Sequence, residues 1–348
     1  MDRKDTREAA SKETSTSRQK IRVLLALALA AMLSLSILGA CQPNTTEPDS
    51  QPEPQEEVRV PVGPVTFTDD LGNEVTVEDP ERVVATMGSF GKIWELAGGT
   101  LIGISDDVDT YTGYALTSKE VARVGDFTSI DLEKVISLNP DFVIMTGSST
   151  GRAGSASQVE FKETLESSGI TVAFFTVTTF QDYLRMLTTC TMITGRSDLL
   201  MTNGASVKNG IEEILSLVPQ DQEKPRVLLL TTFSGGTRVQ DSKTQTGSML
   251  AFLGTKNIAD ENPSLLSDFS LEAIIEANPD FIFVVPMGEN SEEALRSLEE
   301  LTTAHPAWNQ LDAVANGNYI TLTPDLFLYK PNERWAEAYF QLYNYLYT

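Results

Sequence analysis

A fourteen-residue segment occurs twice in this chain of 348 residues, and the two copies lie 139 positions apart. Residues 131–144 read DLEKVISLNPDFVI, residues 270–283 read SLEAIIEANPDFIF, and seven of the fourteen positions are identical. In each copy the pattern predicts a helix that ends at Asn, a proline that prevents its continuation, and a buried strand. Convergence on a favourable helix-to-strand turn is the alternative, but seven identities at one offset favour a duplicated unit. The repeat therefore predicts two similar lobes.

Short apolar runs alternate with helical stretches around both copies. The strands expected from these runs cover residues 82–87, 101–105, 141–146 and 171–177, and, after Pro225, residues 226–232, 281–285 and 319–322. A hairpin is expected at 65–77 and a closing helix at 333–346. Unbroken apolar strands alternating with helices predict the α/β class, with central, mainly parallel sheets that are covered on both faces.

Residues 179–219 carry apolar side chains at helical spacing, with a break at Gly195. About 20 residues of helix after that break would span ~30 Å, which is long enough to join two lobes. Cys190 falls on the apolar face and is expected to be a buried thiol. The expected organisation is therefore an N-terminal α/β lobe at 63–178, linking helices at 179–219 and a C-terminal α/β lobe at 220–348.

The first forty residues have the pattern of an export signal. Seven Lys/Arg side chains within residues 1–22 precede an apolar run, Val23–Ala40, that ends in Leu-Gly-Ala before Cys41. This ending resembles the lipobox of bacterial lipoproteins, which implies a signal peptide at 1–40 and lipidation of Cys41. The Pro- and Glu-rich residues 41–62 are expected to be a disordered tether. An uncleaved membrane anchor is the alternative, because ~18 apolar residues can just span a bilayer. Both place the body at the extracytoplasmic face of the cell membrane.

Composition excludes several classes of function. The chain has 26 basic and 49 acidic side chains and a net charge of −23, which argues against nucleic acid as a partner. One histidine argues against a multi-histidine metal cage, and two cysteines argue against a disulfide scaffold.

Several motifs together resemble one family, the substrate-binding proteins of ABC importers for ferric siderophores, haem and cobalamin. They are FTDDLGNEV from Phe67, RVV from Arg82 with LIGIS from Leu101, VGDF from Val124, the two copies of the repeat, HPAWN from His305, NGNY from Asn316 and PNERWAEAY from Pro331. The resemblance implies two Rossmann-like lobes joined by one long helix. It also implies a monomer without catalytic residues or an intrinsic cofactor. Such a protein captures an iron chelate (ferric siderophore first, haem second, cobalamin third) and delivers it to a permease and its ATPase.

Ligands of α/β sheets collect at the loops after the carboxyl ends of strands. On this rule the candidate ligand-binding residues are Ser89, Phe90, Asp107, Tyr111, Ser148, Phe233, Arg238, Ser248, Met287, Tyr329, Arg334 and Trp335. Arg334 can grip a carboxylate or catecholate oxygen in a bidentate fork. Its alternative role is an ion pair with Glu337. The aromatic side chains are expected either to line the binding site of a macrocycle or to pack in the core. As a third possibility, Tyr111 or Tyr329 ligates haem iron.

The resemblance also implies a glutamate on each lobe that docks the permease. At the matching positions this chain has Lys92 and Ala251, so Glu95, on nearly the same helix face as Lys92, is the remaining candidate.

Two other functions stay open at this point. Gly147-Ser148-Ser149-Thr150-Gly151 matches a nucleophile elbow, and a surface hydrolase would combine Ser149 with His305. His305 also precedes Pro306, where a structural role at a helix start is expected instead. A ligand-sensing surface receptor would use the same fold as an importer.

Overall fold

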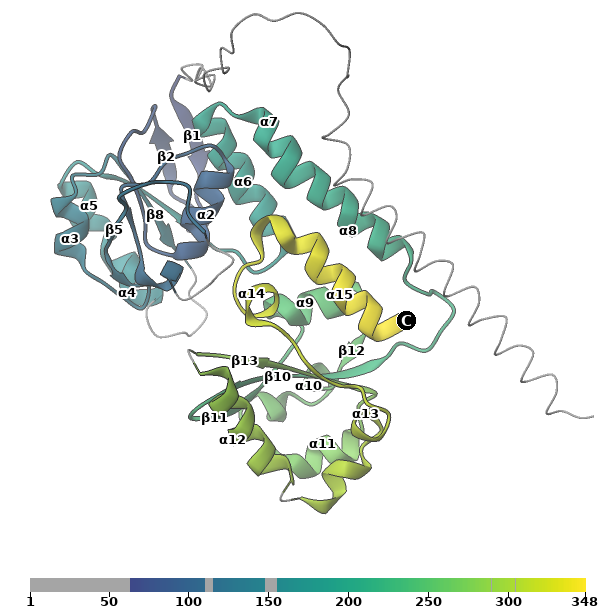
Figure 1. Ribbon diagram of the computed structural model, residues 1–348. Coiled ribbons are helices and arrows are strands. Elements are labelled where there is room, and N and C mark those ends of the chain that lie inside the picture. The colour runs from purple at the N-terminus through teal and green to yellow at the C-terminus, as the bar shows by residue number, and fades with distance from the viewer. Residues whose placement is uncertain (1–62, 110–114, 148–154, 289, 304) are drawn as a thin grey trace, which may run out of the picture. The chain divides into compact units, whose positions relative to one another are not determined.

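Two five-stranded sheets, two short two-stranded sheets and the helices around them make up the part of the chain that the structure describes (Figure 1). One of the short sheets pairs β6 (Gly125–Asp126) with β7 (Ser129–Ile130). The structure is a computed structural model, and the described residues are 63–109, 115–147, 155–288, 290–303 and 305–348. All of them up to Tyr347 belong to one structural unit. The expected signal peptide, the lipidation site at Cys41 and the tether lie outside the described residues.

The first sheet is entirely parallel and has the strand order β5-β4-β3-β8-β9. Its central strands are buried because their side chains are apolar on both faces. The strands are β3 (Val83–Ala85), β4 (Gly103–Ile104), β5 (Ala122–Arg123), β8 (Phe142–Thr146) and β9 (Thr171–Phe175). The accompanying helices are α2 (Gly88–Leu96), the 3-10 helix η1 (Asp106–Asp109), α3 (Leu132–Ser137), α4 (Ser155–Glu160) and α5 (Lys162–Ser167).

The second sheet has the order β11-β10-β13-β14, and β12 also pairs with β10. Only the β10–β11 pair is antiparallel. The strands are β10 (Arg226–Phe233), β11 (Gly236–Gln240), β12 (Lys256–Asn257), β13 (Phe281–Pro286) and β14 (Tyr319–Thr321). The helices are α9 (Gln245–Phe252), α10 (Ile258–Glu261), α11 (Leu271–Ala277), α12 (Ser291–Thr303), α13 (Asp312–Ala315), α14 (Pro324–Phe327) and α15 (Trp335–Tyr347), with the 3-10 helices η4 (Pro263–Leu266), η5 (Pro306–Gln310) and η6 (Asn332–Arg334). The two sheets confirm the expected α/β class.

The segment 233–238 differs from its expected structure. The sequence suggested a ligand loop there, but the chain turns tightly at Ser234-Gly235 and Gly236–Gln240 returns along β10 as strand β11. Phe233 pairs with Gly236, whose φ of 142° suits glycine and closes the turn. Arg238 is therefore a strand residue.

The two copies of the repeat form the same local structure. Asp131 caps α3 through the backbone N–H of Lys134, and Ser270 caps α11 through that of Ala273. After each helix an asparagine takes a left-handed conformation, with a φ of 47° at Asn139 and 43° at Asn278. Each turn thus ends its helix in the same way.

The copies also share the hydrogen bonds that join the turn to the neighbouring strand. Asp141 accepts hydrogen bonds from the backbone N–H of Arg82, and Asp280 accepts one of 2.7 Å from that of Arg226. The Arg82 guanidinium donates to the carbonyl of Leu138, and the Arg226 guanidinium donates to that of Ala277. Arg82 and Arg226 lie outside the two fourteen-residue segments, yet they make equivalent hydrogen bonds. A duplicated unit predicts such agreement.

Two helical segments connect β9 to β10. Helix α6 (Phe180–Thr194) ends at Gly195, where φ is 70°. The chain is then helical from Ser197 to Ser216 through α7 (Ser197–Leu200), a π turn (Met201–Ala205) and α8 (Ser206–Ser216). Cys190 is buried, as expected, and burial raises the pKa of its thiol to about 12.

An antiparallel hairpin opens the described chain, as the sequence predicts. Its strands β1 (Val65–Thr68) and β2 (Glu74–Val77) flank the turn that contains Asp69 and Asp70. Where the structure describes the chain, the helices are too short or too polar to cross a bilayer.

Candidate ligand-binding site

A cavity of about 400 Å³ lies at the carboxyl ends of strands from both sheets. In each sheet the chain leaves its first strand toward one side and later returns to the other side. This places a switch in strand order between β3 and β8, and another between β10 and β13. Thr146 of β8 and Thr231 of β10 both line the cavity. Ligands of open α/β sheets bind at such switch points.

The cavity wall combines hydroxyl groups, charged side chains and apolar surface. Its polar part consists of Thr146, Thr176, Thr178, Thr231, Gln240, Asp241, Lys243, Thr244, Gln245, Thr246 and Lys330. Its apolar part consists of Met87, Phe90, Phe127, Val177, Leu229, Val285, Phe327 and Leu328. Apolar surface with several convergent polar groups is typical of a small-molecule site, and the volume falls within the usual range.

One buried amide organises the wall on the side of the first sheet. Gln158 of α4 is fully buried, and its Oε1 accepts hydrogen bonds from Thr86 Oγ1 at 2.7 Å and from Thr146 N at 3.1 Å. Its Nε2 donates to the carbonyl oxygens of Phe127 at 2.7 Å and Thr86 at 3.2 Å. All four hydrogen-bonding positions of the amide are therefore occupied. Gln158 thus joins Thr86, directly after β3, to the wall residues Thr146 of β8 and Phe127.

A buried carboxylate holds the start of helix α2, whose first turn carries Phe90 into the wall. Both oxygens of Asp107 accept from the backbone N–H of Gly88, at 3.0 and 3.1 Å, and Ser105 Oγ donates to the same carboxylate. Burial raises the pKa of Asp107, and the hydrogen bonds from Ser105 and Gly88 offset only part of that rise. Asp107 thus positions the cavity wall from behind.

Comparison with known proteins identifies the family. A family model described as periplasmic binding protein matches residues 83–326, which is most of the chain. The chain belongs to the periplasmic binding protein family.

Individual relatives agree with this assignment. The chain is 28% identical, over 306 residues, to the uncharacterized ABC transporter substrate-binding lipoprotein YvrC of Bacillus subtilis, covering 85% of this chain and 89% of that protein. It is 30% identical to the iron(3+)-hydroxamate-binding protein FhuD of the same organism, over 35% of this chain and 36% of that one. The structure of Staphylococcus aureus IsdE complexed with heme shares the fold, with a TM-score of 0.62, 18% identity, and coverage of 77% of this chain and 99% of that one.

Membership in a family of binding proteins makes this chain a binding protein and not an enzyme, which removes the hydrolase alternative. His305 is the N-terminal flank of η5, directly before Pro306, and is not among the described residues of the cavity wall. Ser149 lies outside the described residues.

Only some of the predicted ligand-binding residues of this periplasmic binding protein lie at or near the cavity wall. Phe90 lines the cavity, while Ser89 and Asp107 are buried and are not among its described wall residues. Tyr329 sits between two wall residues, and its carbonyl accepts a 2.8 Å hydrogen bond from Gln245 Nε2. Ser248 lies one turn further into α9 and donates to the carbonyl of Gln245. That these residues contact a ligand remains a prediction.

Other candidates have protein partners in the structure. Arg334 forms the anticipated bidentate pair with Glu337, at 2.8 and 2.9 Å. Trp335 is fully buried and meets the ring of Phe180 edge-on. The Arg238 guanidinium lies 5.1 Å from the centre of the Phe233 ring. Met287 is half-buried just after β13. Tyr111 and Ser148 lie outside the described residues.

Two stretches of the wall were missed by sequence reasoning. Thr176–Thr178 follows the carboxyl end of β9 directly, so the rule applied to the other strands would have found it. The stretch around Lys243 follows β11, and it was missed because β11 was not recognised as a strand. The signal for both stretches was the same, namely polar residues directly after a strand.

Glu95, the candidate docking residue, already has backbone partners. Its carboxylate accepts from the N–H of Thr117 at 2.9 Å and from that of Ser118 at 2.7 Å. Lys92 Nζ donates to the carbonyl of Ala115, and Ala251 is exposed. A role of Glu95 in docking stays a prediction.

Proposed function

We propose that this periplasmic binding protein is the substrate-binding lipoprotein of an ABC importer, and that it captures an iron chelate in the cavity described above. The observation that carries the proposal is the position of the cavity, because strand ends from both sheets contribute side chains to it. A ligand that contacts both halves of the chain can draw them together on binding, which is how hinged binding proteins signal occupancy.

A ferric siderophore is the first choice of ligand, haem the second and cobalamin the third. Haem iron takes an axial protein ligand. Among the described residues of the wall, Met87 is the only side chain of a type that commonly ligates haem iron. A siderophore supplies the ligands of its iron itself and needs only hydrogen bonds and charge from the protein. Threonine hydroxyls and the ammonium groups of Lys243 and Lys330 offer both to chelate oxygens.

The cellular setting follows from the sequence and from the relatives. The expected lipidation of Cys41 anchors the protein to the extracytoplasmic face of the cell membrane, and a name that includes "lipoprotein" for the B. subtilis relative supports this. The proposed partners are the small-molecule ligand, the permease and its ATPase, with no nucleic acid partner and no intrinsic cofactor. Glu95 is the proposed docking residue.

Titration of the purified protein with a ferric hydroxamate, ferric citrate, haemin and cyanocobalamin tests this function. Tryptophan fluorescence reports binding, and the visible spectrum of haemin shifts if an axial ligand forms. We expect a Kd below ~10 μM, about −7 kcal/mol, for at least one ferric siderophore. Failure of all four to bind in that range would contradict the substrate class.

A matched pair of lysine variants tests the cavity as the location. Lys243→Met removes a charge from the wall, and Lys208→Met removes one from the exposed face of α8. We expect roughly threefold to fivefold weaker binding of an anionic chelate for Lys243→Met, because an exposed charge contributes up to about 1 kcal/mol. Equal affinities for the two variants would argue against contact between Lys243 and the ligand.

A further inference from the structure

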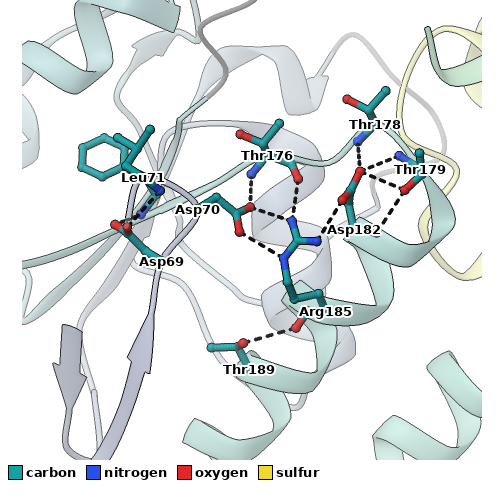
Figure 2. A network of polar contacts seen from close by, with 10 residues as sticks. Asp69, Asp70, Leu71, Thr176, Thr178, Thr179, Asp182, Arg185 and Thr189 are labelled. Atoms are coloured by element: carbon teal, nitrogen blue, oxygen red, sulfur yellow. Dashed lines mark hydrogen bonds and ion pairs between the residues drawn. The ribbon is translucent and has the colours of Figure 1, made fainter. Parts of the chain in front are cut away.

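Residues 176–178 form a stretch of the cavity wall that continues β9 beyond the edge of its hydrogen-bonded ladder. Thr176, Val177 and Thr178 all line the cavity. The last ladder pair of β9 joins Phe175 to Thr146, and among the described residues no strand pairs with the backbone beyond it. Polar groups from two other elements, the β1–β2 turn and helix α6, hold this backbone instead (Figure 2).

The β1–β2 turn supplies three hydrogen-bonding groups, two at Phe174 and one at Thr176. Asp69 Oδ2 accepts from the N–H of Phe174 at 3.1 Å, and the N–H of Asp70 donates to the carbonyl of Phe174 at 2.9 Å. The Asp70 carboxylate then accepts from the N–H of Thr176 at 2.6 Å. The turn therefore takes the place of a sixth strand at the point where β9 ends.

Helix α6 supplies the remaining groups. Asp182 accepts from the N–H groups of Thr178 at 3.1 Å and Thr179 at 2.9 Å, which closes the capping box of the helix. One turn along, Arg185 lies between the two carboxylates, as Figure 2 shows. Its guanidinium donates to both oxygens of Asp70, at 3.0 and 2.8 Å, to Asp182 Oδ1 at 2.8 Å and to the carbonyl of Thr176 at 3.2 Å.

We propose that Arg185, with Asp70 and Asp182, is a positioning residue for ligand binding that fixes the backbone of 176–178 in the cavity wall. None of these three charged side chains is among the described residues that line the cavity, so they act through the wall and not by touching the ligand. The planar fork suits this role because it bonds two carboxylates and a carbonyl in fixed directions. The inference rests on the proposed function in one respect, namely that the cavity is where the ligand binds.

The test compares Arg185→Gln and Asp70→Asn with a matched control, Arg196→Gln. Arg196 forms a similar fork to Asp198, at 2.9 and 2.8 Å, and is not one of the described wall residues. The probe is whichever of the ferric hydroxamate, ferric citrate, haemin and cyanocobalamin the wild-type protein binds. Affinity is measured at 10 °C, well below the melting temperature of each variant, so that a general loss of stability does not alter it. Hydrogen exchange at the Thr176 amide reports the wall itself.

We expect Arg185→Gln and Asp70→Asn to weaken binding about tenfold and to speed exchange at Thr176 by a similar factor, with Arg196→Gln changing neither. Arg185→Lys, which restores the charge without the fork, should recover part of the affinity. Faster exchange at Thr176 with affinities within twofold of wild type would overturn the positioning role. Should Arg185→Gln fail to fold, the nearly isosteric Asp70→Asn carries the same test.

Failure of this inference is distinguishable from failure of the proposed function. A wild-type protein that binds none of the four probes contradicts the proposed function. In that case, hydrogen exchange at the Thr176 amide still tests the structural part of the inference, namely that Arg185 and Asp70 fix the backbone of residues 176–178. An exchange rate unchanged in both Arg185→Gln and Asp70→Asn would overturn it.

Discussion

Replacement of Gln158 by leucine removes the buried amide that joins Thr86, Thr146 and the Phe127 loop. The amide makes four hydrogen bonds of 2.7 to 3.2 Å at a fully buried position. At about 1 kcal/mol net for each bond, their loss destabilises the fold by roughly 4 kcal/mol. Leucine fills most of the volume but gives the carbonyl oxygens of Thr86 and Phe127 no donor. Because a domain is stable by roughly 5–15 kcal/mol in total, the effect is a large part of the free energy of unfolding.

Urea denaturation at pH 7 measures this loss, with Gln341→Leu as the control. Gln341 is a partly exposed amide on α15 whose Nε2 donates over 3.4 Å to Glu337, so its replacement should change stability by less than ~0.5 kcal/mol. Gln158→Leu should also weaken ligand binding, because Thr146 and Phe127 both line the cavity. A destabilisation below ~1 kcal/mol would show that the four bonds are not formed together, and would refute the role given to this amide.

Two further predictions concern carboxylates. Because burial raises the pKa of Asp107, the folded protein holds that proton more tightly than the unfolded chain, and stability is lost as pH rises from the ordinary value of 3.8 through the folded pKa. The free energy of unfolding of Asp107→Asn, measured by urea denaturation, should therefore rise relative to that of wild type between pH 4 and pH 7. A difference between the two proteins that stays the same across this range would contradict the raised pKa. In the repeat, Asp141 accepts from the amides of Glu81 and Arg82, whereas Asp280 accepts from that of Arg226. Replacing either aspartate by alanine should lower the free energy of unfolding by about 1–2 kcal/mol, with the larger loss at Asp141. A larger loss at Asp280 than at Asp141 in thermal denaturation would contradict this hydrogen-bond pattern.

The local structure of the repeat and the longer apolar strands, such as β8, β9, β10 and β13, were predictable because their patterns are local. Asn139-Pro140-Asp141 and its copy each specify a helix end and a strand start within a few residues. Strand β11 was not predictable in this way, because its residues alternate weakly and its order depends on pairing with β10.

The candidate site was only partly predictable, because lining a cavity depends on side-chain direction and on distant partners. Phe90 was found from its place after a strand. Arg334 was chosen for its chemistry, but Glu337 one turn along α15 provides its fork with a partner within the same segment. Gln158 gave no signal, since a glutamine in a short helix is ordinarily exposed and its three partner residues are Thr86 after β3, Thr146 of β8 and Phe127.

Paramagnetic broadening by a bound ferric chelate would locate the ligand directly. Backbone amide signals of the protein are recorded with the ferric chelate that it binds and with the diamagnetic gallium form of the same chelate. We expect the iron to broaden signals of cavity residues from both halves of the chain, Thr146 and Thr176 together with Thr231 and Thr244. Broadening confined to one half, or centred away from these four threonines, would contradict capture of the chelate in this cavity.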